Sequence, residues 1–506
     1  MPESQNNQSL TDLLIIGGGV NGCGIARDAA GRGLKVTLCE KDDLAAHTSS
    51  ASTKLVHGGL RYLETYEFRL VAEALREREV LLKAAPHIVW PLRFVLPHDR
   101  NLRPRWMLRL GLFLYDRIGG RRTLPGSHGV DLRKPPHRAI LKDRLTRGFE
   151  YSDCWVEDSR MTVLAAMDAR ELGAEILTRT ECIGLERTAD GWIAALRQPD
   201  GSERVVEARA VVNAAGPWVD GIAGLALGRG TPARLRLVKG SHIIVPRLYQ
   251  GDHAYIFQQE DGRIVFAIPY EHDFTLIGTT DELFEGDPGT VAISPEERAY
   301  LRDAVGGYFR TGIAEEDIVS TYAGVRPLYD DHAASNSTVT RDYVFELDAD
   351  DGAAPILSIY GGKITTFRKL AEHALEKLSD HLPMREAWTK DAPLPGGDMA
   401  DFEGFVKRAG ERYSWLPPRL LRRLCRAYGT RIDRVIGTAD GMDRLGEHFG
   451  GDLYEAELRY LAREEFAQCA EDVLWRRGKL GLHLPDAAAS RIDAWFAAGI
   501  AGGSAA

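Results

Sequence analysis

The 506-residue chain lacks the features that mark secreted, membrane-spanning and nucleic-acid-binding proteins. Its six cysteines form no C-x-x-C pair, which argues against a disulfide framework or a zinc site. No uncharged apolar run reaches the ~18 residues of a membrane-crossing helix, and the polar start MPESQNNQSLTD does not resemble a signal peptide. A net charge of −9 offers no basic excess to nucleic acid. These absences indicate a cytosolic protein with reduced thiols and no metal site, in which contact with a membrane surface stays open.

A glycine-rich stretch near the start carries the strongest positive signal. The apolar run Leu13–Ile16 reads as a buried parallel strand, and Gly17, Gly19 and Gly22 follow it in G-x-G-x-x-G spacing. A helical pattern comes next, and a second apolar run ends in Glu40. In this context the glycines allow a tight turn, approach to a pyrophosphate and close helix packing, while the acid suits a ribose hydroxyl. We therefore predict a dinucleotide site rather than a merely structural glycine turn.

A second strand–glycine turn–helix pattern, far along the chain, helps to distinguish FAD from NAD as the cofactor. Glu40 favours the unphosphorylated ribose of NAD or FAD over NADP. Far along the chain, Leu357–Tyr360, Gly361-Gly362 and the helical run Ile364–Leu378 place another helix N-terminus near an electron-rich group. Such a helix end could stabilise negative charge on a reduced flavin ring. NAD would not require it, so the pattern favours FAD.

Two further stretches have the small residues that suit contact with a flat ring. One runs from the Ser/Thr-rich segment after Glu40 into HGGLRYL. The other, VVNAAGPWVD, ends an apolar strand in a turn that contains Gly216. The second could be a structural turn, but we favour a second crossing beside the cofactor.

The middle and end of the chain indicate further domains. The range from 234 to 280 is rich in β-formers separated by short turns, which predicts an antiparallel sheet in an inserted substrate-covering domain. Pro295–Tyr308 reads as a helix. WTKDAPLPGGD reads as a linker, and helical periodicity dominates beyond Asp401.

The segment Leu102–Ile118 combines a helical apolar stripe with four arginines, and two alternatives remain open for it. It resembles a basic amphipathic helix at a membrane interface, and an ordinary helix facing the core would show the same periodicity.

Four cations, Arg61, Arg326, Arg341 and Lys363, stand in turn-like contexts beside glycine or proline, or open a strand. Each taken alone is most simply a surface charge. Together they are compatible with a pocket for a dianionic small molecule, because guanidinium groups form bidentate bonds with phosphate oxygens.

The sequence resembles the respiratory, FAD-dependent glycerol-3-phosphate dehydrogenase family. The resemblance covers about 13–397 and is carried by IIGGGVNGCGIARDAAGRGL, TSSASTKLVHGGLRYLE, RGFEYSDCWVEDSR, VVNAAGPWVD, KGSHIIVP, IGTTD, GVRPL, TRDY and GGKITTFRKLAEHALEKL. It implies an α/β fold: a Rossmann-like FAD-binding domain with an inserted antiparallel-sheet substrate domain, similar to p-hydroxybenzoate hydroxylase and D-amino-acid oxidase. The expected oxidoreductase region is 1–390, with FAD-binding segments about 1–90, 150–220 and 320–388 and a substrate domain about 225–320. A C-terminal all-α domain is expected over 391–506.

The resemblance also assigns expected site residues. Those expected at FAD are Gly17, Gly19, Gly22, Glu40, Thr48, Ser49, Ser50, Ser52, His57, Gly216, Gly361 and Gly362. Those expected at the substrate are Arg61, Tyr62, Thr280, Arg326, Arg341 and Lys363. Expected catalytic groups are His57, Lys363 and Arg326.

The implied reaction oxidises sn-glycerol 3-phosphate to dihydroxyacetone phosphate by hydride transfer from C2 to flavin N5, and electrons pass to a membrane quinone. A base must take the C2 hydroxyl proton. His57 is our preferred base because its ordinary pKa is near neutrality, and Lys363 is the alternative if neighbouring cations lower its pKa. An arginine base is disfavoured by its very high pKa.

The resemblance further implies peripheral attachment to the inner face of the cytoplasmic membrane, and it leaves a homodimer open. One rival function is a glycerophosphate oxidase that reduces oxygen. The chain shows no long insertion in the flavin domain of the kind such oxidases tend to carry. A second rival is a non-catalytic metabolite sensor that retains the fold.

Overall fold

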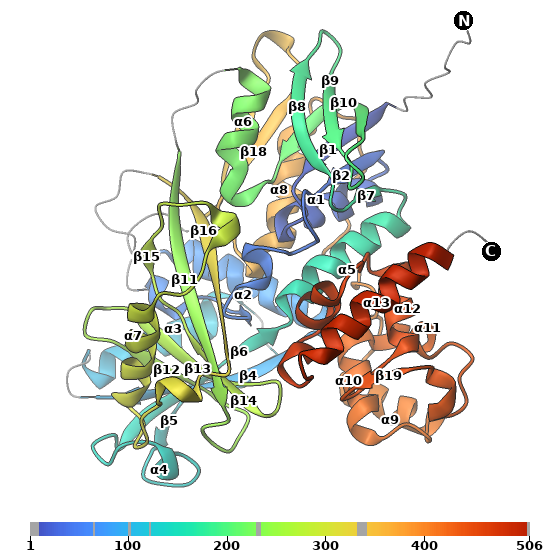
Figure 1. The fold of residues 1–506 in the computed structure, drawn as a ribbon. Coiled ribbons are helices and arrows are strands. Elements are labelled where there is room, and N and C mark those ends of the chain that lie inside the picture. Colours follow the sequence, from blue (N-terminus) through green and yellow to red (C-terminus); the bar gives the residue numbers. More distant parts are fainter. Residues whose placement is uncertain are drawn as a thin grey trace, which may run out of the picture.

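The computed structural model describes residues 10–63, 66–99, 103–120, 123–228, 234–330 and 342–502, without the side chains of Arg61, Asp351 and 500–502. Two large sheets and a C-terminal group of helices make up these residues (Figure 1). The first sheet lies at the end of the molecule from which the N-terminus leaves, and the second sheet lies at the other end.

The first sheet is built from segments spread over most of the chain. Its strands are β1 (Thr11–Ile16), β2 (Val36–Cys39), β7 (Glu175–Leu177), β8 (Glu181–Arg187), β9 (Trp192–Arg197), β10 (Glu203–Asn213), β17 (Val344–Asp348) and β18 (Ile356–Tyr360). Their order is β17-β18-β10-β1-β2-β7, and β9 joins β8 to β10. The run from β18 to β7 is parallel, as expected of a Rossmann-like sheet.

Both faces of this sheet are covered, which explains why its central strands are apolar throughout. Helices α1 (Val20–Gly31), α5 (Asp158–Glu171) and α8 (Phe367–Leu378) supply one core. The β8–β9 hairpin and α6 (Val219–Leu227) supply the other. Leu13, Leu14 and Ile15 are consequently fully buried. Such two-sided burial is what a parallel sheet requires.

The second sheet is mostly antiparallel. Its strands are β3 (Leu55–Val56), β4 (Val89–His98), β5 (His128–Asp131), β6 (Arg147–Val156), β11 (Leu235–Pro246), β12 (Ala254–Gln258), β13 (Ile264–Tyr270), β14 (Phe274–Gly278), β15 (Glu282–Leu283) and β16 (Ser320–Tyr329). The expected range of about 225–320 contains β11–β15 and helix α7 (Pro295–Gly306). The sheet also takes β3–β6 from earlier in the chain, because β4 pairs with both β6 and β12.

Helices α2 (Phe68–Ala84) and α3 (Arg105–Ile118) lie beside this second sheet, and the short α4 (His137–Ile140) follows β5. Helix α3 buries only Leu112 and Tyr115. Much of the apolar stripe predicted over Leu102–Ile118 is exposed instead: Leu110 is 50% exposed and Trp106 67%. The alternative in which this stripe faces the core is therefore wrong. Among the described residues, no helix is both long and apolar enough to cross a membrane.

The C-terminal region is helical, as expected. Its helices are α9 (Phe402–Arg412), α10 (Pro418–Tyr428), α11 (Ile432–Ile436), α12 (Glu455–Glu464) and α13 (Ala487–Gly502). It also contains a π-helical segment, Asp472–Arg477, and a two-stranded ribbon of β19 (His448–Gly450) and β20 (Leu453–Tyr454). Its apolar side chains join those of α1, α5 and α8 in one continuous core.

Candidate active site

The predicted glycine turn joins β1 to α1 and leaves no room for side chains. A Cβ on Gly17, whose φ is +114°, would lie 2.4 Å from the carbonyl oxygen of Ala214. A Cβ on Gly22 would lie 1.9 Å from the carbonyl oxygen of Gly17. The N-terminus of α1 thus meets the ends of β1 and β10 at van der Waals distance, and its free N–H groups can face a pyrophosphate.

Glu40 stands at the end of β2 beside this turn. Its carboxylate accepts hydrogen bonds from the N–H of Gly18 at 2.6 Å and of Asp42 at 2.8 Å. Burial raises the pKa of Glu40, against the effect of these two donors. The two bonds fix the orientation of the acid that was predicted to receive a ribose.

The second glycine turn lies against the first helix. The Asn21 side-chain amide on α1 donates to the carbonyl oxygen of Gly361 at 3.1 Å, and a Cβ on Gly362 would lie 2.8 Å from that amide. Asn21 Oδ1 is buried and has no hydrogen-bond partner among the described residues. These observations fit FAD: two helix starts meet through Asn21, and an acceptor there is left for a ligand.

Gly216, expected at the cofactor, opens the turn after β10. Its φ is +57°, and a Cβ placed on it would have no heavy atom within 4 Å. The turn therefore has open space beside it, consistent with a bulky ligand.

In the predicted Ser/Thr segment, several hydroxyl groups form hydrogen bonds with other parts of the protein. The Ser49 hydroxyl accepts from the N–H of Val20, the first residue of α1, at 2.9 Å. Thr48 donates to the Val325 carbonyl on β16, and Ser50 donates to the His47 carbonyl. Ser52 donates to Asp158 at the start of α5. These bonds hold the segment that we expect to lie along the flavin.

His57 and Tyr62 are brought close to Lys363, which lies about 300 positions further along the chain. The His57 N–H donates to Thr365 Oγ1 at 3.3 Å, which ties the HGGLRY segment to the start of α8. Lys363 Nζ lies 4.0 Å from the centre of the Tyr62 ring. Burial and the charge of Lys363 lower the pKa of His57 to about 4. The imidazole is therefore neutral at pH 7 and able to accept a proton.

Arg326 lies on β16, and the carbonyl oxygen of its neighbour Pro327 would be 3.8 Å from a Cβ on Gly361 of the second glycine turn. Its guanidinium contacts Asp281 Oδ1 and the Thr280 carbonyl oxygen, both at 3.2 Å.

The other predicted substrate residues have different placements. The Thr280 side chain is fully buried, donates to Glu297 and accepts from the N–H of Ser241, so its hydroxyl supports β11 and α7. Arg341 and the side chain of Arg61 lie outside the described residues, and their expected roles remain predictions.

His242 is a candidate that the sequence analysis missed. It lies on β11, stacks on Tyr322 with ring centres 4.6 Å apart, and its Nε2 is 3.0 Å from Thr53 Oγ1. Its buried Nδ1 has no hydrogen-bond partner among the described residues. Burial, followed by the charges of Lys54 and Arg326, lowers its pKa. The only signal was a histidine inside the apolar strand of KGSHIIVP, a context that a core histidine would share.

Lys54 links the Ser/Thr segment to α5 through buried hydrogen bonds. It is 1% exposed and donates to Asp158 Oδ1 at 2.7 Å and to the Ser50 carbonyl at 3.0 Å. Although burial acts against it, the Lys54 ammonium holds the pKa of Asp158 below its usual range. This buried pair anchors the Ser/Thr segment to α5.

The parallel sheet with its glycine turn and ribose acid defines a dinucleotide-binding oxidoreductase. The model of the FAD dependent oxidoreductase family matches residues 12–368, and the chain therefore belongs to that family, with FAD as its cofactor. The model of the C-terminal domain of alpha-glycerophosphate oxidase matches residues 387–497.

Three similar proteins span nearly the whole chain. A glycerol-3-phosphate dehydrogenase of Pseudomonas aeruginosa is 55% identical, covering 94% of this chain and 92% of its own. A D-erythritol 1-phosphate dehydrogenase of Brucella abortus is 53% identical, covering 96% and 97%. An aerobic glycerol-3-phosphate dehydrogenase of Escherichia coli is 49% identical, again covering 96% and 97%.

Among solved structures, a glycerol-3-phosphate dehydrogenase of Bacillus halodurans complexed with FAD has a TM-score of 0.77 and 28% identity, over 98% of this chain and 92% of that one. An L-alpha-glycerophosphate oxidase of Mycoplasma pneumoniae has a TM-score of 0.60 and 19% identity, over 76% and 99%. The second likeness shows the shared fold alone.

Proposed function

We propose that this chain oxidises sn-glycerol 3-phosphate to dihydroxyacetone phosphate and passes the electrons to a membrane quinone. One observation carries the proposal: the His57 N–H donates to Thr365 Oγ1 at 3.3 Å, two residues after Lys363, and burial and the charge of Lys363 lower the pKa of His57 to about 4. The names of two relatives at 49–55% identity supply the substrate.

The residues divide the work as follows. Arg326 and Lys363 bind the phosphate, because guanidinium and ammonium groups form charge-assisted hydrogen bonds with phosphate oxygens. His57 takes the proton of the C2 hydroxyl, which its neutral form can accept. FAD, when bound, accepts the hydrogen and electron pair that leave C2. Tyr62 packs against Lys363 and limits the positions of that side chain.

The flavin spectrum tests this proposal directly. Anaerobic addition of sn-glycerol 3-phosphate to the purified FAD-loaded protein should bleach the flavin absorbance within one turnover. Tight binding of the phosphate without bleaching would indicate a sensor and contradict the proposal.

D-Erythritol 1-phosphate is a second candidate substrate, because the Brucella relative named for it is 53% identical over 96% of this chain. The two compounds are best compared by the second-order rate constant of anaerobic flavin reduction on one preparation. A ratio above about 10 in favour of glycerol 3-phosphate, or about 1.4 kcal/mol, supports the first proposal. The reverse ratio would assign the longer polyol phosphate.

The electron acceptor and the location of the chain belong to the same proposal. Helix α3 exposes Trp106, Leu110, Phe113 and Leu114. Arg105, on the same helix, is also exposed. An apolar face flanked by arginines suits shallow insertion into an anionic membrane surface. We therefore place the protein peripherally on the inner face of the cytoplasmic membrane, where quinone is available.

Acceptor choice is measured by supplying the reduced protein with a soluble quinone analogue or with oxygen. Faster reoxidation by the quinone is expected. Fast peroxide production with no response to quinone would assign the oxidase alternative.

A further inference from the structure

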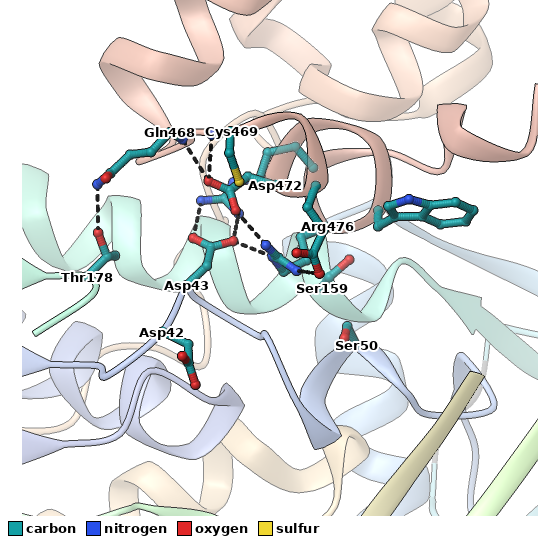
Figure 2. A network of polar contacts seen from close by, with 12 residues as sticks. Asp42, Asp43, Ser50, Ser159, Thr178, Gln468, Cys469, Asp472 and Arg476 are labelled. Carbon is teal, nitrogen blue, oxygen red and sulfur yellow. Dashed lines mark hydrogen bonds and ion pairs between the residues drawn. The ribbon is translucent and has the colours of Figure 1, made fainter. Parts of the chain in front are cut away.

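The loop that follows the ribose acid is held by the C-terminal region. Asp43, three residues after Glu40, is 2% exposed and accepts a hydrogen bond from Arg476 Nε at 2.5 Å. It also accepts from Arg477, whose Nη2 lies 2.8 Å away. Both arginines end the π-helical segment Asp472–Arg477, more than 400 positions further along the chain. Figure 2 shows Asp43 and Asp472 facing the side chain of Arg476.

A second arm of this network reaches the neighbouring loop of the FAD-binding sheet. Asp472 accepts from Arg476 at 2.5 Å, from Arg179 at 2.8 Å and from the N–H of Gln468 at 2.7 Å. Arg179 lies between β7 and β8, and its own N–H donates to the Asp42 carbonyl at 2.7 Å. Carboxylates and guanidinium groups therefore alternate from Asp43 to Arg179, and Asp43, Arg476 and Asp472 are all buried.

This network continues to Glu40 through the backbone. The Asp42 N–H donates to Glu40 Oε1, while Glu40 Oε2 accepts from the N–H of Gly18. The N–H of Ala45 donates to the Gly18 carbonyl oxygen at 3.1 Å. The loop that carries Asp43 is thus hydrogen-bonded both to Glu40 and to Gly18 of the glycine turn, so a displacement of this loop would displace Glu40.

We propose that the C-terminal region is part of the FAD site, with Arg476 and Arg477 as positioning residues that hold the Asp42–Ala46 loop, and through it Glu40, in the cofactor-binding arrangement. The loop has little apolar anchorage of its own beyond Leu44 and Ala45. A buried carboxylate keeps its place only with its cationic partners, so Asp43 stays inside only while the C-terminal region is docked. By linkage, FAD binding and docking then stabilise each other.

The alternative is that the network only stabilises the fold. A matched control separates the two. Arg431 in the C-terminal region makes a bidentate pair with Glu171, with both contacts at 2.5 Å. Glu171 ends α5, about 20 Å along the helix from Asp158, where the Ser/Thr segment is anchored. This pair joins the C-terminal region to the FAD-binding region at the end of α5 opposite Asp158.

The experiment uses the full chain and four variants: Asp43→Asn, Arg477→Met, the double variant, and Glu171→Gln. Each is stripped of FAD and titrated with FAD by fluorescence, and thermal melting is recorded with and without FAD. Asp43→Asn and Arg477→Met should each weaken FAD binding about 10-fold or more. The loss of FAD affinity in the double variant should be smaller than the two single losses combined, because both substitutions remove the Asp43–Arg477 contact. Glu171→Gln should leave FAD affinity within about twofold.

Two results would overturn the proposal. One is unchanged FAD affinity in folded Asp43→Asn and Arg477→Met. The other is an equal loss in Glu171→Gln, which would mean that docking in general, and not this loop, sets the affinity. If Arg477→Met does not fold, Arg476→Lys keeps the charge but cannot reach Asp43, Asp472 and Glu471 together, and it should still weaken FAD binding. Because FAD affinity is measured without substrate, these outcomes do not depend on which polyol phosphate is oxidised.

Discussion

Substitution of Gly240 by alanine moves the Arg326 guanidinium without removing its charge. Gly240 lies on β11, opposite Gly324 of β16. A Cβ at this position would lie 2.5 Å from Arg326 Nη2 and 2.7 Å from Thr279 Oγ1. Both atoms end side chains, so they can shift while the backbone stays in place. Folding should therefore be affected little and substrate binding strongly.

The expected size follows from the contacts of Arg326. Its Nη2 lies 3.2 Å from the Thr280 carbonyl oxygen and 3.4 Å from Thr279 Oγ1, so relieving the clash displaces it from at least one acceptor. A hydrogen bond to a charged group contributes about 1.5–3 kcal/mol. If the displaced guanidinium loses one such bond to the substrate phosphate, the Kd of the substrate should rise about 10- to 150-fold. Arg326→Ala should produce at least the same loss.

The assay is anaerobic flavin reduction over a range of glycerol 3-phosphate concentrations, together with FAD content and thermal melting. Gly221→Ala is the control, since this helical glycine has open space around it and alanine is preferred in helices. Normal substrate affinity in FAD-loaded Arg326→Ala would refute the assignment of Arg326 to the phosphate. Loss of FAD from Gly240→Ala would contradict the expectation that this substitution affects the substrate-phosphate site and not the FAD site.

Three further predictions test other parts of the structure. His57→Asn should slow flavin reduction at saturating substrate by about 100-fold or more. In the native chain the reduction rate should fall only as the pH drops towards about 4, because a base works in its deprotonated form. A fall centred near pH 6.5 would contradict the low pKa of His57. Lys54→Met leaves Asp158 buried without its main cation, which should lower the free energy of unfolding by about 3–5 kcal/mol, measured by denaturant unfolding; an unchanged midpoint would mean that the pair is not what anchors this segment. Replacing Trp106 and Phe113 by alanine should weaken retention on anionic liposomes at least about 10-fold, because each buries apolar area in the interface, whereas unaltered sedimentation would exclude α3 as the contact.

The sequence predicted local features well where the conformation or the spacing of neighbouring residues decides the structure. Gly17 was predicted to allow a sharp turn, and its φ of +114° confirms it. Gly22 was predicted to allow close helix packing, and the 1.9 Å between a Cβ placed there and the Gly17 carbonyl oxygen confirms it. The helix at 105–118 was also predicted, because its period is local. The direction in which its apolar stripe faces was not predicted, since that depends on the other elements against which the helix packs.

Contacts between distant segments escaped the sequence for a related reason. The residues around Ser49 do not indicate that its hydroxyl accepts a hydrogen bond from the start of α1. Thr280 was expected to bind the substrate, but its hydroxyl donates a hydrogen bond to Glu297. Side chains with several bonding options take the one that tertiary packing brings within reach.

By itself, then, the sequence determined the class of cofactor, because the glycine spacing and the acid after the second strand are properties of one continuous segment. It also supplied the candidate cations for an anionic substrate, whose roles stay predictions. Only the tertiary structure decided that the charge of Lys363 acts on His57, that His242 contacts Thr53, and that Asp43 accepts a hydrogen bond from Arg477. Each of these pairs is separated by at least 189 positions. Burial and charge at such contacts are set by the folded chain as a whole.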